Sequence, residues 1–344
     1  MPTILGIDYP TLWFLVVGGL FSGYAILDGF DLGAGALHLF FRKEESRRIA
    51  LNAIGPVWDG NEVWLVIGGG ALFAGFPVLY ATLFSGMYIP FMLFLAFLIF
   101  RAVSIEFRSK EKMKWWRQMW DVSYSISSAM LAVLLGVVLG NVLLGMDIGP
   151  SQEYEGNWVE FLNPYALLVG LTTLALFSTH GALYLLMKTE GRLYAKLTIL
   201  ARRAMIFFIV TFALVTLYTL IYIPHLTDRF KAIQWLFIVP VLAFLSIANI
   251  PRLISKRRYG QAFFFSGLTM ALLLIVVAIE LYPVLILSTV DKTYSITIYN
   301  AASSSKSLGL MLLFAAIGAP LVLSYTAFVF WTFRGKVKLD ETSY

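Results

Sequence analysis

Cysteine is absent from the 344 residues, and charged side chains make up only 13% of them. Without thiols the chain can form neither disulfides nor iron–sulfur clusters nor thiolate metal sites. Soluble domains carry about 25% charged residues, whereas this chain is 59% hydrophobic and 16% aromatic. The composition therefore predicts a protein that crosses a membrane many times rather than a soluble domain with one anchor.

Long apolar runs recur along the whole chain. A membrane-crossing helix needs about 20 mostly apolar residues, and nine stretches reach that length. The sequence predicts an all-α integral membrane protein of nine transmembrane helices, arranged as two four-helix bundles plus one peripheral helix. The predicted helices cover residues 11–41, 51–73, 79–107, 121–145, 163–187, 203–223, 234–254, 261–288 and 308–333.

The connecting segments alternate in charge. Basic side chains gather in segments 42–50, 108–120, 188–202 and 255–260 and in the C-terminal tail. Of the other connections, 74–78 has no charge and 146–162 has only acids. Because cytoplasmic loops of membrane proteins are enriched in lysine and arginine, we expect the N-terminus outside and the C-terminus in the cytoplasm. This distribution also explains the net charge of +6 without a nucleic-acid surface.

We expect a single membrane domain that covers residues 1–344. Residues 1–145 hold helices one to four, 163–288 hold helices five to eight, and 308–333 hold the ninth. The N-terminus has no basic region and no small-residue cleavage site, so we expect no cleavable signal peptide.

Four carboxylates lie inside the apolar runs. Asp28 and Asp31 belong to the first predicted helix, and Asp59 and Glu62 belong to the second. Each pair has i, i+3 spacing, which places both acids on one face of a helix. An ionised acid at membrane depth costs several kcal/mol at least, so it persists where it is paired, hydrated or functional.

The predicted topology brings the two acid pairs to one depth, roughly 12–20 Å from the cytoplasmic edge. Repulsion and burial would keep some of these acids protonated near neutral pH, and such a cluster is what a proton path needs. Three glycines between residues 29 and 35 permit close helix contact or a local opening. Beside the second pair, Asn61 and the indole N–H groups of Trp58 and Trp64 can donate to carboxylates.

The alternative interpretation is structural: each acid could form an ion pair with a basic side chain from another helix. Few basic residues lie deep enough in the predicted helices to neutralise four acids. Arg101, near the cytoplasmic end of the third predicted helix, is the main candidate.

Two stretches carry a family resemblance: Asp28-Gly-Phe-Asp-Leu-Gly-Ala-Gly35 and Trp58-Asp-Gly-Asn-Glu-Val-Trp64. They resemble subunit II of the cytochrome bd family of quinol oxidases. The nine-helix layout extends the similarity over the whole chain, and it is densest over residues 10–190. Further matching segments are Phe100-Arg101, Met119-Trp120-Asp121, Gly140-Asn141 and Leu162-Asn163-Pro164.

The resemblance implies a partner, subunit I, that carries haems b and d and the site of quinol oxidation. The complex would pass electrons from quinol to oxygen, forming water, in the cytoplasmic membrane of a bacterium or archaeon. Protons for this reaction would come from the cytoplasm and quinol protons would leave outside, so a proton-motive force arises without pumping. A small single-helix third subunit and, in some members, a structural quinone are also implied.

The resemblance further implies that this chain supports subunit I and supplies a proton-access route. Asp28, Asp31 and Asp59 match family acids associated with proton uptake. Two positions depart from the pattern: Val57 stands where some relatives have histidine, and Glu62 where some have glutamine. The route therefore lacks an imidazole at position 57, and Glu62 is a candidate replacement group. The supporting polar residues are Trp58, Asn61, Trp64, Arg101 and Asp121.

We expect no catalytic residue, haem or metal ion in this chain itself. Of its three histidines, His38 lies near the cytoplasmic end of the first helix and His225 in an outer connection, so only His180 is deep. No two histidines have metal-ligand spacing, and we expect His180 to form hydrogen bonds within the bundle. Glu280 matches no family motif, and we expect a local pair or a partner contact for it.

A second hypothesis is a proton-coupled secondary transporter that uses carboxylates at the membrane midplane. Such transporters often contain repeated halves with broken helices at corresponding positions. The acid pairs of the first two predicted helices have no clear counterpart on the fifth and sixth, which favours the oxidase subunit.

Overall fold

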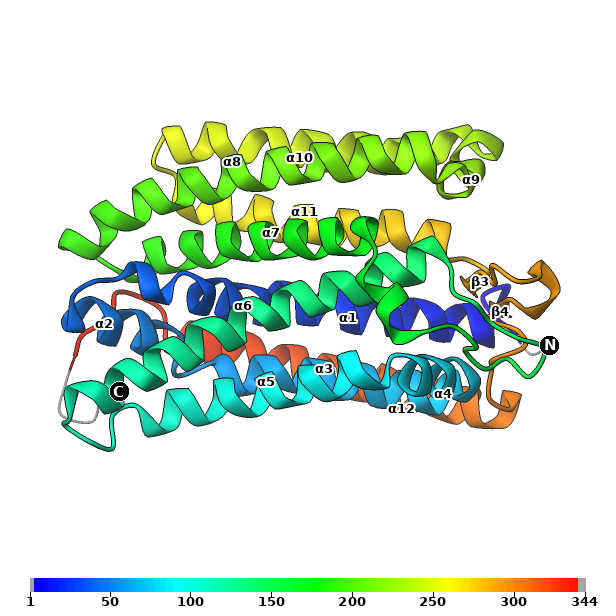
Figure 1. Ribbon diagram of the computed structural model, residues 1–344, viewed down its shortest axis with the longest axis horizontal. Helices are drawn as coiled ribbons and strands as arrows, with labels where there is room; N and C mark the ends of the chain where they lie inside the picture. Colours follow the sequence, from blue (N-terminus) through cyan, green and yellow to red (C-terminus); the bar gives the residue numbers. More distant parts are fainter. Residues whose placement is uncertain (1–2, 340–344) are drawn as a thin grey trace.

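Long helices lie side by side along the longest axis of the molecule (Figure 1). The structure is a computed structural model that describes residues 3–339. Its long helices are α1 (Tyr9–Ala36), α3 (Trp58–Gly75), α5 (Tyr88–Phe107), α6 (Lys114–Leu144), α7 (Pro164–Lys188), α8 (Gly191–Tyr222), α10 (Ile238–Ser255), α11 (Tyr259–Glu280) and α12 (Ser305–Thr332).

Short elements connect the long helices. The strands form two antiparallel pairs, β1 (Thr3–Ile4) with β2 (Ile7–Asp8) and β3 (Val284–Ile286) with β4 (Ile296–Thr297). The short helices are α2 (Glu44–Ile54), α4 (Pro77–Gly86), α9 (Asp228–Ala232), η1 (His38–Phe40), η2 (Trp158–Leu162), η3 (Pro224–Thr227), η4 (Gln234–Phe237) and η5 (Lys292–Tyr294).

Polar caps define where several long helices begin. Asp8, Asn163 and Ser304 each accept a hydrogen bond from the backbone N–H three residues on, at the starts of α1, α7 and α12. Such N-caps satisfy backbone donors that have no partner inside the helix. These caps matter more in a lipid environment, because no water is present there to form hydrogen bonds with the backbone donors instead.

Within residues 3–339, eight helices are long and apolar enough to cross a membrane. A ninth crossing results if α3 and α4, which meet at a bend of 118°, are taken as one broken span. The prediction of a helical membrane protein is therefore confirmed. The orientation of the helices in the membrane stays a prediction.

Three predicted helix ranges are wrong in detail. Residues 51–73 do not form one helix, because α2 ends at Ile54 and α3 begins at Trp58, with Pro56 between them. Residues 79–107 are divided at Met87 into α4 and α5. Proline has no N–H and clashes with the preceding turn, so a helix rarely continues through it. The last part of the predicted range 261–288 forms β3 instead of helix.

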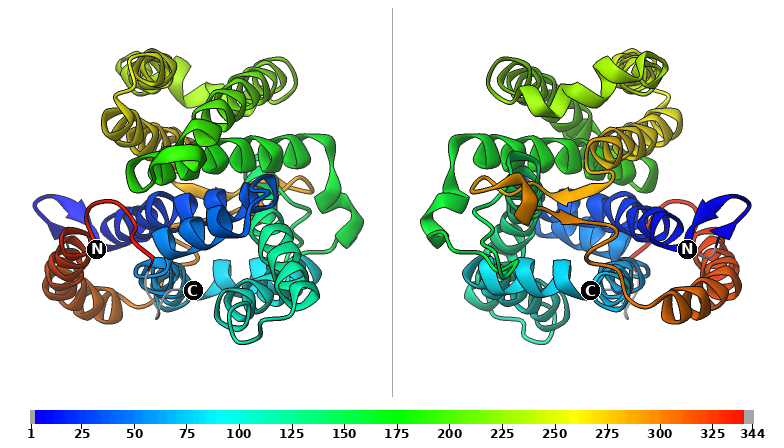
Figure 2. Two further views of the ribbon diagram at one scale, coloured as in Figure 1. Left: turned by 90° about the vertical axis from the view of Figure 1, so that its left-hand side faces the viewer. Right: turned by 90° about the vertical axis from the view of Figure 1, so that its right-hand side faces the viewer.

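One hydrophobic core connects helices from both predicted bundles. Its buried residues come from α1, α2, α3, α5, α6, α7, α8, α10 and α11. Helix α1 lies at the centre and contacts α3, α6, α7, α11 and α12. The end views show α8 and α10 on one side of this centre and α3, α5 and α12 on the other (Figure 2). The division into two bundles stays a prediction.

Glycines allow α1 and α7 to pack backbone against backbone. A methyl group at Gly33 would collide with the carbonyl of Phe177, and one at Gly181 would collide with the backbone of Ala34. Small residues serve this purpose in membrane helix pairs generally. Gly33 thus serves close helix contact. For the glycines near Asp31 the sequence had left open two roles, close helix contact and a local opening.

Basic connections gather at one end of the molecule. The α1–α2, α5–α6, α7–α8 and α10–α11 connections lie together at this end, whereas β1, β3 and α9 lie at the other (Figure 1). We call the first end the basic end. It is the end that the sequence predicts to face the cytoplasm.

Candidate functional site

The deepest ion pair of the molecule joins α1 to α5. The guanidinium of Arg101 donates to both oxygens of Asp28, at 2.5 and 3.0 Å, and both side chains are fully buried. The Trp58 ring lies 6.0 Å from the same guanidinium. A buried pair of this geometry satisfies two charges that could not be left alone in an apolar interior. Asp28 therefore has the kind of partner that the structural interpretation predicts, a basic side chain from another helix.

Glu62 also reaches Arg101. Its carboxylate lies 3.4 Å from the guanidinium, and 21% of its side chain is exposed. Asp28 and Glu62 thus share one cation from opposite sides of the α1–α3 contact. Because Glu62 is at the edge of the cluster, it connects the buried pair with the surface of α3.

Asp31 has a neutral partner. The amide of Asn61 donates to one carboxylate oxygen at 2.7 Å. The other oxygen is buried and has no hydrogen-bond partner among the described residues. Asp28, Asp31 and Glu62, together with Arg101 and Asn61, form what we call the acid cluster.

Asp59 lies apart from the acid cluster. It belongs to the first turn of α3 and is exposed on the surface of the chain. An acid in the first turn of a helix interacts favourably with the helix dipole. The four acids therefore do not form one buried cluster: the break before α3 makes Asp59 an exposed helix-start residue, three positions before Glu62. The part of Asp59 in a proton path stays a prediction.

The two tryptophans beside the second acid pair serve packing. Trp58 is 7% exposed and Trp64 is 9% exposed. Trp64 lies against α1 at Gly23, where a methyl group would strike its ring. Among the described residues, neither indole N–H donates to a carboxylate. Their expected role as donors to the acids is not seen, although both lie next to the cluster.

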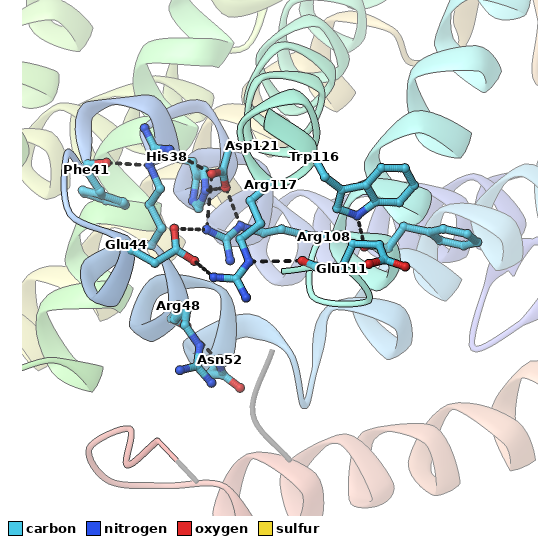
Figure 3. A network of polar contacts seen from close by, with 12 residues as sticks. His38, Phe41, Glu44, Arg48, Asn52, Arg108, Glu111, Trp116, Arg117 and Asp121 are labelled. Atoms are coloured by element: carbon cyan, nitrogen blue, oxygen red, sulfur yellow. Dashed lines mark hydrogen bonds and ion pairs between the residues drawn. The ribbon is translucent and has the colours of Figure 1, made fainter. Parts of the chain in front are cut away.

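Asp121 belongs to a second polar cluster at the basic end (Figure 3). Its carboxylate accepts from Arg108 at 2.6 Å and lies 2.5 Å from the Nε2 atom of His38. Arg47 adds a contact at 2.8 Å. Glu44 in turn pairs with Arg108 at 3.0 Å. We call these five residues the end cluster. The sequence predicts Asp121 as a supporting polar residue near the start of its helix. In the structure it is the eighth residue of α6 and contacts the end cluster instead of the acid cluster, and its part in a proton route stays a prediction.

Arg108 carries the positive charge that compensates Asp121 most closely. Burial lowers the pKa of this guanidinium, but the carboxylates of Asp121 and Glu44 raise it above its ordinary value overall. Arg108 is only 2% exposed, so it stays charged inside the protein. The end cluster therefore ties α1, α2, α5 and α6 together through charge.

One face of α1 connects the two clusters. Tyr24, Asp28, Asp31, Gly35 and His38 follow at alternating spacings of four and three residues, which places them in one line along the helix and its η1 extension. All five are buried. We call this line the α1 seam. Periodicity could have revealed it in the sequence, but His38 was assigned no role there.

Several buried polar atoms along the α1 seam have no partner in the described chain. They are the Tyr24 hydroxyl, one oxygen of Asp31, Nδ1 of His38, and the Ser128 hydroxyl, which faces Gly35. Buried polar atoms in proteins are nearly always hydrogen-bonded, to protein or to water. Three exceptions on the seam, with a fourth on α6 facing it, mark this line as different from the rest of the core.

The remaining histidines have structural partners. In His180, Nδ1 lies 2.5 Å from the Ser266 hydroxyl and Nε2 lies 3.1 Å from the Ile26 carbonyl. The expectation of hydrogen bonds within the bundle is confirmed, and neither ring nitrogen is left to ligate an iron. Nε2 of His225 lies 3.1 Å from the carbonyl of Leu143. Over residues 3–339, no three His, Asp or Glu residues are grouped as a metal site.

Glu280 ends α11 at the side opposite the basic end. One of its oxygens is buried without a hydrogen-bond partner among the described residues. Arg229 lies in its electrostatic neighbourhood. That guanidinium donates to the carbonyl of Tyr282 and lies 4.9 Å from the centre of its ring. A local charge partner for Glu280 was one of the two sequence expectations.

Comparison with known proteins decides the family. A family model described as cytochrome bd terminal oxidase subunit II matches residues 9–333. The chain belongs to this family. It is 34% identical to subunit 2 of the cytochrome bd-I ubiquinol oxidase of Escherichia coli (strain K12) over 97% of both chains. It is 33% identical to subunit 2 of the cytochrome bd ubiquinol oxidase of Bacillus subtilis (strain 168), over 96% of this chain and 97% of that one.

A solved structure has the same fold. The bd oxidase from Geobacillus thermodenitrificans contains a chain that superposes with a TM-score of 0.77 at 20% identity, covering 94% of this chain and 98% of that chain. The family resemblance that the two acid-bearing stretches predict is confirmed. This subunit II therefore belongs to a quinol oxidase complex, an oxidoreductase of bacterial respiration, and it implies a partner subunit I. The family suggests that the haems belong to that partner.

Proposed function

We propose that this subunit II supplies protons to subunit I, where oxygen is reduced to water. The α1 seam supports the proposal most directly. It aligns groups that can accept or donate protons from His38 at the basic end to Asp28, about 15 Å further along the helix. The family gives the reaction of the complex, but it does not explain why this apolar chain contains a line of buried polar groups. A proton route would explain it.

Water is the natural connection between the members of the seam. Buried polar groups without a protein partner are usual positions for ordered water. Water bound at the Ser128 hydroxyl would lie between His38 and Asp31, which are seven residues apart on α1. Carboxylates, an imidazole and water are groups that relay protons. The end cluster would collect protons, and the acid cluster would receive them.

The charge of the acid cluster favours an exchangeable proton. Its one cation among the described residues, Arg101, contacts the carboxylates of Asp28 and Glu62, and the carboxylate of Asp31 lies in its electrostatic neighbourhood. If all three were ionised, the cluster would hold an excess of two negative charges in a low-dielectric interior, which is costly. A proton shared among the acids lowers this cost. It can leave again whenever a better acceptor comes near.

The exposed face of α3 is where we propose that protons leave the chain. Asp59 and the partly exposed Glu62 lie on it, next to exposed Val63 and Val66. A carboxylate facing lipid would be costly, so this face needs a covering partner. Helices α3, α5 and α12 lie together on one side of the molecule (Figure 2), and Leu308 is the one buried residue that α12 has in the described chain. Subunit I is the partner that we place here.

The direction of transport follows from the predicted topology. With the basic end in the cytoplasm, protons would enter near His38 and move toward the middle of the membrane. If quinol protons leave on the outer side, a proton-motive force arises without pumping. A small third subunit and a structural quinone stay predictions from the resemblance. The transporter alternative has no comparable feature among the described residues in its favour.

The test is the pair of variants Glu62→Gln and Asp59→Asn, with Glu190→Gln as a control. Glu190 precedes α8 and is exposed, away from both clusters. We expect the complex with either site variant to keep its haems but to reduce oxygen with quinol at least roughly tenfold more slowly, because positioned proton transfer commonly contributes more than that. The control should keep full activity.

Each outcome of this test decides something. Full turnover of both site variants at normal haem content would overturn the route through α3. Loss of haem together with activity would indicate an assembly defect instead. In that case the pre-steady-state uptake of protons by the haem-loaded fraction gives the answer, since a conducting residue slows it and a structural one does not.

A further inference from the structure

A groove runs between α10 and α11 on the outer surface of the protein. It consists of two adjoining cavities of about 510 and 550 Å³. Asn249, Arg252 and Phe265 line both, so the two cavities are continuous. This volume is that of a site for a drug-sized or larger ligand, and neither polar cluster described above takes part in it.

The part of the groove at the basic end is lined by cations. Arg252, Lys256 and Arg258 surround it, together with the amide side chains of Asn249 and Gln261. No acid is among the lining residues. Within residues 3–339, none of the three cations has an ion-pair partner. Three uncompensated cations and two amides form a surface that attracts an anion with several oxygen acceptors.

The other part of the groove is apolar and points toward the middle of the helices. Leu242 and Leu245 on α10 face Leu268 and Leu272 on α11. Leu242 lies ten residues before Arg252, which corresponds to about 15 Å along the helix. The groove thus places an anion site at the membrane edge and a long apolar channel beneath it.

We propose that this groove binds an anionic phospholipid. The phosphate would lie among Arg252, Lys256 and Arg258, and one acyl chain would lie along the leucines of α10 and α11. Basic pockets between transmembrane helices on the cytoplasmic side are suited to anionic headgroups. A free phosphate would explain the cations but not the apolar channel that continues from them.

The position of the groove supports a lipid as occupant. Helix α10 lies on the side of the molecule opposite α3, α5 and α12 (Figures 1 and 2). The side that carries the exposed acids is the one that needs a protein partner, whereas the α10 side can remain open to the bilayer. This argument rests on the proposed placement of subunit I against α3, α5 and α12, but not on the proton route.

The experiment counts lipids on the intact complex by native mass spectrometry. The probes are palmitoyl-oleoyl phosphatidylglycerol and palmitoyl-oleoyl phosphatidylcholine, which differ only in the headgroup. One complex carries Arg252→Gln, Lys256→Gln and Arg258→Gln. The control carries Arg192→Gln, Arg202→Gln and Arg203→Gln, which removes the same charge from exposed positions on α8.

We expect the groove variant to bind phosphatidylglycerol roughly 100-fold more weakly, because each cation near an anionic lipid contributes about a factor of five. The control variant should bind it like the parent complex, and phosphatidylcholine should be insensitive to all six changes. Oxygen reduction by both variants should stay normal, which also shows that they fold.

Three results would overturn the proposal. Equal loss of phosphatidylglycerol in both variants would mean that only total charge matters. Displacement of the lipid by millimolar inorganic phosphate would reduce the groove to an anion site. A co-purifying polypeptide that protects the groove from lipid would show that a protein is its occupant.

Discussion

Removing Arg101 tests whether the acid cluster is as desolvated as the geometry indicates. The change Arg101→Gln deletes the cation that bonds both oxygens of Asp28 and reaches Glu62. Because Arg101 and Asp28 are fully buried, Asp28 is left as a buried charge without compensation. Breaking a buried pair from one side typically costs about 3–5 kcal/mol.

The double variant Asp28→Asn with Arg101→Gln separates pairing from proton conduction. It removes both charges, so we expect it to recover most of the stability that the single change loses, since the penalty comes from the unpaired charge. The exposed pair of Arg117 with Glu44, at 3.2 Å, provides the control. There, Arg117→Gln should cost at most about 1 kcal/mol.

The assay is thermal unfolding of the purified complex, followed by haem absorbance, with oxygen consumption measured on the same samples. We expect a clear loss of stability for Arg101→Gln, a small one for Arg117→Gln, and a stable but slow enzyme for the double variant. If Arg101→Gln costs no more than the exposed control, the cluster is not desolvated and the charge argument is refuted. If the double variant is stable and fully active, Asp28 has a structural role only.

Three further predictions concern packing, the end cluster and orientation. Gly33→Ala should strongly lower the yield of assembled complex, because the added methyl group meets backbone atoms and no rotamer change can accommodate it. Gly18→Ala should leave the yield unchanged in the same expression test, because a methyl group there meets nothing within 4 Å. Asp121→Asn should destabilise the complex in thermal unfolding, by up to about 3–5 kcal/mol, since it leaves buried Arg108 with the exposed Glu44 as its remaining carboxylate partner; an unchanged midpoint would contradict this. A cysteine placed at exposed Ser151 should react with an impermeant maleimide in intact cells, while one at exposed Ser109 should react only after permeabilisation. The reverse pattern would contradict the predicted topology. Because the chain has no cysteine of its own, the label reports only on the introduced residue.

The acid cluster was partly predictable. The spacing of Asp28 and Asp31 placed both on one face of α1, and Arg101 was recognised as the basic residue deep enough to pair with an acid. Spacing could not show that Asp28 takes the arginine while Asp31 takes the amide of Asn61. That choice depends on how far each helix is rotated about its axis, which is set by packing.

Two acids lie elsewhere than beside Asp28 and Asp31, for identifiable reasons. Asp59 was counted as a mid-helix acid because the apolar run continues through Pro56, but the chain breaks there and Asp59 becomes an exposed helix start. Asp121 was predicted as a supporting residue at the start of its helix, but spacing could not show which side chains it contacts. The helix in fact begins at Lys114, and its first turns bring Asp121 to His38.

Hydrophobic length, charge distribution and local motifs were enough to predict the membrane character of this protein, its helical segments and its family. The tertiary structure decided which acid is paired, which is exposed, and where α10 and α11 leave a groove. Those features arise from contacts between residues far apart in the chain, such as Asp28 with Arg101, and contacts of this kind depend on which helices are neighbours and how closely their backbones approach.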